Sequence, residues 1–257
     1  MRNLRAQLTY DGSRFHGWQR QDGFASVQQA VEEALAELLG SPVVVRGAGR
    51  TDTGVHALRQ VASFHADTRL DDERLLHALN AHLPEGVACR DIETCRDDFH
   101  AQKDARGKRY GYLIRTTAFR SPLGRPYAHW VREPLDLAAM RAGAAHLVGE
   151  HDFRAFASSG SPRRTSVRTL HAVHLVARRD SLWIVLQGSG FLYNMARAIV
   201  GTLLDVGRGR RPADDVAAIL ASRSRASAGA TAPACGLYLV RVLYREPCFA
   251  AGRARRS

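Results

Sequence analysis

The chain has 257 residues, of which 45% are hydrophobic and 24% are charged, a balance typical of globular proteins. This length can bury a full core in one large domain or in two smaller ones. Lysine and arginine number 37 against 25 acidic residues, which gives a formal net charge of +12, and all but two of these cations are arginine. Genomic bias can explain the choice of arginine over lysine, but not the excess over acids. A basic surface favours a polyanionic partner, above all nucleic acid.

Membrane spans, disulfides and zinc sites find no support in the sequence. No apolar run is long enough to cross a bilayer, and no signal peptide is recognisable. Cys89, Cys95, Cys235 and Cys248 form no Cys-x-x-Cys pair. Cys89 and Cys95 lie six residues apart on a predicted strand, too far along it for a disulfide. We therefore expect reduced thiols and a cytoplasmic protein.

The sequence of the first half predicts strands and helices in the order β-α-β-β-α-β, as in a ferredoxin-like unit. Alternating apolar residues predict a strand over residues 2–10. Helical spacing predicts a helix between Ser26 as N-cap and Gly40 as terminator, with Gln29 at the capping-box position. Similar patterns predict a helix over residues 71–83 and strands over residues 42–46, 59–66 and 87–95.

The second half repeats this order of elements, although not the sequence. It predicts strands at 108–115, 170–177, 182–188 and 237–244, and helices at 135–148, 191–206 and 213–222. We therefore predict an α+β fold with two halves, residues 1–104 and 105–257. We expect them to join into an extended, mostly antiparallel sheet with helices on one face and a central cleft, where ligands commonly bind.

Three long irregular segments carry many of the arginines, at residues 117–134, 157–169 and 222–236. Long loops of this kind are either functional or disordered. Basic residues interleaved with tyrosine and tryptophan suit single-stranded or looped nucleic acid, whose bases stack on aromatic rings. The arginine-rich tail at residues 253–256 is interpreted as a solvated end.

A glycine-rich segment, residues 47–57, is the main candidate for chemistry. It follows the apolar run 43–45, so it is predicted to be a loop that leaves a strand, and its glycines allow close backbone approaches. Its one carboxylate, Asp52, lies two residues from Arg50. This arrangement suits an ionised acid presented to a ligand, because loops on rigid scaffolds often carry function. The alternative is an Asp-Thr-Gly turn in which the side chain only bonds its own backbone.

Better-known signatures of glycine-rich loops do not fit this segment. A dinucleotide fingerprint requires a glycine where Asp52 stands, and a P-loop requires a following Gly-Lys-Ser/Thr. The tripeptide 52–54 matches the aspartic-protease signature, but those enzymes use two such aspartates that share a proton. With one copy in this chain, a protease is possible only as a dimer.

Five motifs together resemble those of the TruA family, the bacterial tRNA pseudouridine synthases. Residues 10–19 resemble the opening motif of that family, and residues 49–57 resemble its catalytic motif. Residues 99–101 with 108–112 are similar to the central motif, and residues 190–201 and 231–239 complete the set. The matches run in order over nearly the whole chain. The departures, at Ala196, Ala198 and Cys235, do not touch the residues with expected roles.

The resemblance implies an isomerase that converts uridines 38, 39 and 40 of the tRNA anticodon stem-loop to pseudouridine. It also implies the pseudouridine synthase fold, a homodimer, and catalysis without metal or cofactor. The histidines lack metal-ligand spacing. Two alternatives stay open: pseudouridine formation at other RNA uridines, and a non-catalytic tRNA-binding protein. The set of tRNAs modified is also left open.

The resemblance, together with the chemistry and position of the side chains, gives five candidate site residues. Asp52 would be the catalytic nucleophile or base, and Arg197 would pair with it and lower its pKa. Tyr110 would stack on the detached uracil, although an ordinary core ring is the alternative. Arg50 would assist base flipping or hold phosphate, and Asn194 lies beside Arg197 near the start of a predicted helix. Attack at uracil C6, attack at C1′ and proton removal from C2′ would all use the same aspartate.

Overall fold

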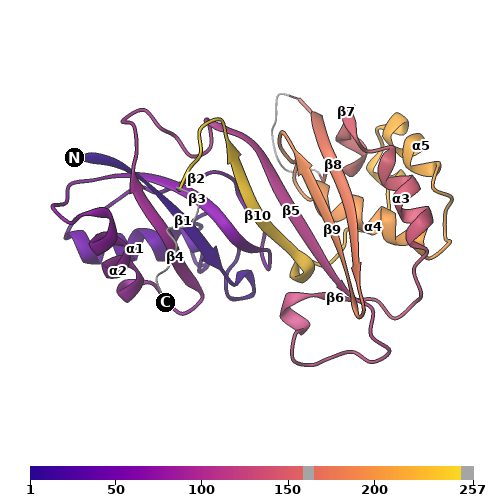
Figure 1. Ribbon diagram of the computed structural model, residues 1–257, viewed down its shortest axis with the longest axis horizontal. Coiled ribbons are helices and arrows are strands. Elements are labelled where there is room, and N and C mark those ends of the chain that lie inside the picture. Colours follow the sequence, from indigo (N-terminus) through magenta and orange to yellow (C-terminus); the bar gives the residue numbers. More distant parts are fainter. Residues whose placement is uncertain (159–164, 250–257) are drawn as a thin grey trace. The chain divides into compact units, whose positions relative to one another are not determined.

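The computed structural model describes residues 1–158 and 165–249 (Figure 1). The chain forms two compact units: unit 1 holds residues 1–106 and the described residues from 239 onward, and unit 2 holds residues 107–238. The final strand therefore lies mostly in unit 1, whereas the sequence analysis assigned it to the second half.

Unit 1 contains a sheet in the order β4-β1-β3-β10, with a short β2 on β3. Strand β1 pairs antiparallel with both β3 and β4. Its alternation buries Leu4, Ala6 and Leu8, so the strand predicted at the N-terminus is confirmed. The bounds of the strands are β1 Arg2–Tyr10, β2 Arg46–Gly47, β3 His56–Ala66, β4 Val87–Thr94 and β10 Leu237–Tyr244.

Two helices pack on each other in unit 1, α1 (Val27–Leu39) and α2 (Asp72–His82). The predicted ends of α1 are confirmed: Ser26 Oγ accepts the Gln29 backbone N–H at 3.3 Å, and Gly40 adopts a left-handed φ of 69°. The Gln29 side chain donates to Glu33 instead of completing a reciprocal capping box. The α1 boundary thus rests on the serine and the glycine.

Unit 2 contains a sheet in the order β5-β9-β8-β7, with β6 parallel to β5. The predicted hairpin is confirmed, with β8 and β9 antiparallel. Helix α3 packs on α4 and β8, and the buried core includes Tyr112, Met140, Phe153 and Leu203. The bounds are β5 Ala105–Arg115, β6 His129–Trp130, β7 Gly149–Asp152, β8 Val167–Arg178, β9 Ser181–Gly188, α3 Leu137–Ala145, α4 Met195–Gly207 and α5 Asp215–Ser222. Helices and mostly antiparallel strands in both units confirm the α+β class.

The strand predicted over residues 42–46 is wrong except at its end, where β2 covers Arg46–Gly47. Side chains of α1 take the backbone groups that a strand would offer to a neighbour. Val45 N–H donates to Glu32 Oε1 at 3.1 Å, and Val45 C=O accepts from Gln28 Nε2 at 3.1 Å. The following strand, β3, begins at His56, three residues before the predicted start at Arg59.

Helix α4 begins at Met195, four residues after the predicted start at Phe191. The reason is Asn194, which adopts a left-handed φ of 60° and so interrupts the helical backbone. Helix α3 is also shorter than predicted. It starts after Asp136, whose Oδ1 accepts the N–H groups of Ala138 and Ala139.

The cysteines are reduced thiols, as the sequence predicts. All four cysteines are free, and burial raises the pKa of the Cys89 thiol to about 12. Among the described residues, no helix has the length and apolar character needed to cross a bilayer. Arg163 and Arg164, and the basic tail at 253–256, lie outside the described residues.

Candidate active-site loop and its supports

The candidate catalytic loop is residues 48–55, between β2 and β3 of unit 1. Asp52 is half-buried within it, and Arg50 is exposed. Both ends of the loop are fixed by backbone hydrogen bonds: Ala48 N–H donates to Val61 C=O at 2.7 Å, and Val55 N–H donates to Asp52 C=O at 3.0 Å. The carboxylate is therefore carried by a short, closely held turn.

Residues of the opening motif pack directly against this loop. Trp18 N–H donates to Thr51 C=O at 3.0 Å, and Gly12 N–H donates to His56 Nδ1 at 3.1 Å. Gly17 has a φ of +92°, and a Cβ there would lie 2.6 Å from Thr51 O. Glycine is required because any side chain would displace the loop. The first sequence motif thus supports the second one.

A buried polar cluster joins the loop to β1 and β3. Tyr10 OH lies 2.8 Å from Thr51 Oγ1, and Gln60 Nε2 donates to Gly49 C=O at 2.7 Å. Tyr10 and Gln60 are 4% and 0% exposed, and burial raises the pKa of the Tyr10 hydroxyl above its usual range. The sequence analysis did not single out Gln60. Arg59, Ser63 and His65 of the same strand are also polar, so the sequence pattern did not distinguish Gln60.

Arg197 and Asn194, both predicted site residues, come together in unit 2. Arg197 Nη1 donates to Asn194 Oδ1 at 2.8 Å, and Arg197 Nε donates to Ala232 C=O at 2.7 Å. Asn194 Nδ2 in turn donates to Ser158 Oγ at 3.1 Å. Both side chains are half-buried. The guanidinium is therefore held in one orientation by a side chain and by the main chain.

Tyr110, the predicted stacking residue, lies on β5 and is 6% exposed. Its ring packs edge-on against Phe191, with the centroids 4.9 Å apart and the planes at 75°. The sequence predicts Phe191 at the start of a helix, but residues 191–194 are not helical, so helical spacing did not indicate this contact. Asp52 and Arg50 belong to unit 1, whereas Tyr110, Asn194 and Arg197 belong to unit 2.

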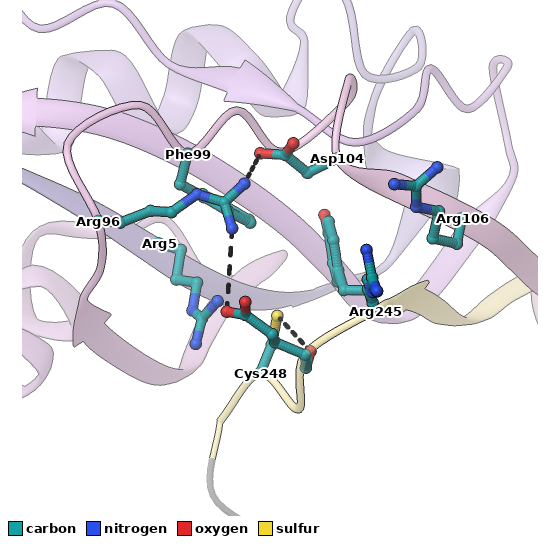
Figure 2. Close-up of a pocket in the computed structure, with 9 residues that line it drawn as sticks. Arg5, Arg96, Phe99, Asp104, Arg106, Arg245 and Cys248 are labelled. Carbon is teal, nitrogen blue, oxygen red and sulfur yellow. Dashed lines mark hydrogen bonds and ion pairs between the residues drawn. The ribbon is translucent and has the colours of Figure 1, made fainter.

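A separate cavity of about 200 Å³ in unit 1 is lined by arginines and aromatic rings (Figure 2). Arg96, which faces Asp104 in Figure 2, lies 2.9 Å from its carboxylate and 5.8 Å from the centre of the Phe99 ring. Arg5 pairs with Glu93. Much of the positive charge is therefore neutralised locally. None of the predicted site residues lines this cavity.

The described residues were expected to lack a metal site, because their histidines have no metal-ligand spacing. They contain no group of three or more histidine, cysteine, aspartate or glutamate side chains that could hold a metal ion. The histidine of the catalytic motif, His56, is 1% exposed and accepts the Gly12 N–H, so it serves to pack the loop.

Comparison with known proteins assigns the chain to a family. The profile of the tRNA pseudouridine synthases matches residues 6–102 and 144–245. This chain belongs to the tRNA pseudouridine synthase family. A tRNA pseudouridine synthase A of Acetivibrio thermocellus is 46% identical over 244 residues, covering 95% of this chain and 100% of that protein. One of Syntrophotalea carbinolica is 46% identical over 241 residues, covering 94% and 96%.

A weaker match is to a solved archaeal box H/ACA sRNP Nop10-Cbf5 complex. It covers 78% of this chain and 44% of that chain, at 12% identity and a TM-score of 0.37. As a member of the tRNA pseudouridine synthase family, the chain is a pseudouridine-forming isomerase. This assignment overturns the aspartic protease and the non-catalytic binding protein as alternatives.

Proposed function

We propose that this enzyme isomerises uridines 38, 39 and 40 in the anticodon stem-loop of tRNA, as a cytoplasmic homodimer. The motifs in residues 10–19, 49–57 and 190–201, which resemble the TruA family, support this choice of substrate position. The net charge of +12 supports binding to a polyanion. The observation that carries the proposal is Asp52, a single carboxylate on a loop held from both sides by buried contacts.

In the proposed reaction, Asp52 acts as nucleophile or base. The N1–C1′ bond breaks and the C5–C1′ bond forms, while the proton lost from C5 is balanced by a proton gained at N1. The product is an isomer of the substrate, so no oxidant or other reactant is consumed. A carboxylate suits each of the three routes, because it can bond to C6 or C1′ or accept a proton from C2′.

The proposed roles of the remaining site residues follow from their chemistry and the resemblance. Tyr110 stacks on the uracil while it is detached from its ribose. Arg197 supplies the positive charge that keeps the carboxylate ionised, and Asn194 orients this arginine. Arg50, exposed on the loop, contacts a phosphate or the flipped nucleotide. A cleft between the halves that brings these residues to one uridine stays a prediction.

The test is pseudouridine formation in an unmodified tRNA transcript, mapped by position, for the wild type and for Asp52→Asn. Asparagine keeps the size of the side chain but can neither attack as a nucleophile nor accept the proton. We expect product at positions 38–40 with the wild type, and none with Asp52→Asn although it still binds tRNA. The matched control is Asp22→Asn, at an exposed position, which should retain full activity.

Two outcomes would overturn parts of this proposal. Product at other uridines only would contradict the anticodon assignment and favour the alternative substrate. If the Asp52→Asn enzyme had the wild-type rate, Asp52 could not be the nucleophile or base.

A further inference from the structure

Three residues of unit 1 form a continuous hydrogen-bonded cluster beside Asp52, which we call the loop brace: Tyr10, Thr51 and Gln60. Gln60 Nε2 lies 3.4 Å from Tyr10 OH, to which it donates. Tyr10 OH accepts this N–H, so its own proton is available for Thr51 Oγ1, 2.8 Å away. The brace therefore runs from β3 through β1 to the residue that precedes Asp52 in the chain.

The antiparallel register explains why these residues meet. Leu8 pairs with Gln60, and Tyr10 pairs with Ala57. The side chains of Tyr10 and Gln60 therefore come from nearby positions on neighbouring strands. Each lies in the interior, where an unpaired polar group costs about 1–3 kcal/mol. The Gln60 amide uses both ends, since its Oε1 accepts the Val61 N–H at 3.2 Å. Satisfied buried networks of this kind have one preferred geometry.

The brace holds the chain at two points just ahead of the carboxylate. Gln60 fixes the Gly49 carbonyl, and Tyr10 fixes the Thr51 hydroxyl. A third contact, from Trp18 N–H, fixes the Thr51 carbonyl. The segment before Asp52 is thus restrained through the Thr51 side chain and through the backbone carbonyls of Gly49 and Thr51.

We propose that Tyr10 and Gln60 are positioning residues, which act through Thr51 and Gly49 to aim the Asp52 carboxylate at the reacting uridine. This inference rests on the proposed role of Asp52. The physical reason is that catalysis requires near-attack geometry, and a displacement of about 1 Å can cost about 100-fold in rate. Substrate binding should be insensitive to the brace, because Tyr10, Thr51 and Gln60 are all buried.

The test uses variants that remove one hydroxyl with little change of shape. Tyr10→Phe and Thr51→Val each delete one partner of the 2.8 Å hydrogen bond. Thr51→Ser keeps the hydroxyl and should rescue the rate. Tyr244→Phe is the matched control, since Tyr244 OH is likewise hydrogen-bonded within unit 1, where it donates to the carbonyl of Ala101 at 2.7 Å. The kcat at saturating tRNA, the Kd for tRNA and the melting temperature are measured for each variant.

We expect kcat to fall about 10- to 100-fold for Tyr10→Phe and Thr51→Val, with Kd for tRNA unchanged. The double variant should be no slower than Tyr10→Phe, because Tyr10→Phe already removes the bond to Thr51 together with the one that Gln60 donates. Tyr244→Phe should keep the wild-type kcat even if its melting temperature drops. Since the readout is the rate of folded, tRNA-bound enzyme, a loss of stability alone does not mimic this result.

The inference is overturned if Tyr10→Phe and Thr51→Val keep the wild-type kcat, or if Thr51→Ser is as slow as Thr51→Val. Should Tyr10→Phe fail to fold, the Thr51→Val and Thr51→Ser pair decides alone. Failure of the proposed function has a different signature, because the Asp52→Asn enzyme would then be active. An inactive Asp52→Asn enzyme with fully active brace variants would leave the function intact and refute only the positioning role.

Discussion

Arg197 makes a pair of contacts that depend on the shape of a guanidinium group. Its Nε and Nη1 donate to a backbone carbonyl and to an amide oxygen at the same time. A lysine ammonium is a single point charge that cannot reproduce this planar fork. The orientation of the charge, and not only its presence, therefore depends on the guanidinium.

We predict that Arg197→Lys lowers kcat/KM about tenfold or more, although the positive charge is retained. Initial rates over a range of concentrations of a tRNA transcript measure this effect. The matched control is Arg178→Lys, at an exposed position of β8, which should match the wild type. Equal rates for Arg197→Lys and the wild type would show that charge alone is sufficient.

Tyr110 provides a second prediction at this scale. Its hydroxyl has no part in stacking, so Tyr110→Phe should keep most of the activity, whereas Tyr110→Ala should lose the ring. Base stacking contributes about 1–3 kcal/mol, which corresponds to a loss of about 5- to 150-fold in kcat/KM for Tyr110→Ala. If Tyr110→Phe were as slow as Tyr110→Ala, the hydroxyl and not the ring face would be the important group.

At the scale of elements, the short strand β6 carries a histidine with an altered titration. Burial lowers the pKa of His129, as does the Arg208 guanidinium, and Glu133 partly opposes them. The His129 ring also packs edge-on against Tyr112, with the centroids 6.1 Å apart. The neutral form is thus favoured in the folded protein.

The sign of the resulting pH dependence follows from this direction. Below about pH 6.5, the unfolded chain binds a proton at His129 more readily than the folded chain does. The stability from this group is therefore present above that pH and is lost as the pH falls through the folded pKa. We predict that His129→Phe, which keeps the ring contact, reduces the loss of stability between about pH 7 and 5. Urea unfolding at several pH values measures the free energy of unfolding of both proteins. The prediction is contradicted if this free energy changes with pH equally in His129→Phe and the wild type.

Helix α1 illustrates the energetic weight of a local signal. Ser26 is 2% exposed and caps the helix through its Oγ. We predict that Ser26→Ala lowers the free energy of unfolding by about 1 kcal/mol, as measured in urea. The control, Ser41→Ala at an exposed position just after the helix, should change it by less than about 0.5 kcal/mol. Equal effects of the two variants would argue against the cap.

At the scale of the whole molecule, the net charge of +12 predicts strongly salt-dependent binding to tRNA. Each phosphate contact contributes about 0.7–0.9 to the slope of log K against log salt. We predict a steep slope for the wild type, and a slope reduced by about one such contact for Arg50→Gln. Filter binding at several salt concentrations measures both. A Kd that does not vary with salt would contradict an electrostatic mode of binding.

Local patterns predicted much of the fold. Alternation defined β1, helical spacing with a serine and a glycine defined α1, and β10 lies where its pattern predicted it. These signals succeed because the period of a helix or a strand places its apolar side chains on one face, and because residues next to a helix cap its ends. The prediction over residues 42–46 failed, because Glu32 and Gln28 bind the backbone of Val45. Those side chains come from α1, so the apolar pattern of residues 42–46 could not indicate these contacts.

By itself, the sequence determined the order of most elements, the α+β class, the basic charge and the glycine loop that carries Asp52. It also contains the motifs that resemble the family, in which Asp52, Tyr110 and Arg197 were recognised. Only the tertiary structure decided how these residues are supported. Gln60 reaches Tyr10 across fifty residues of chain, and Arg197 reaches the carbonyl of Ala232. Such contacts depend on strand register and loop packing, which no local pattern encodes.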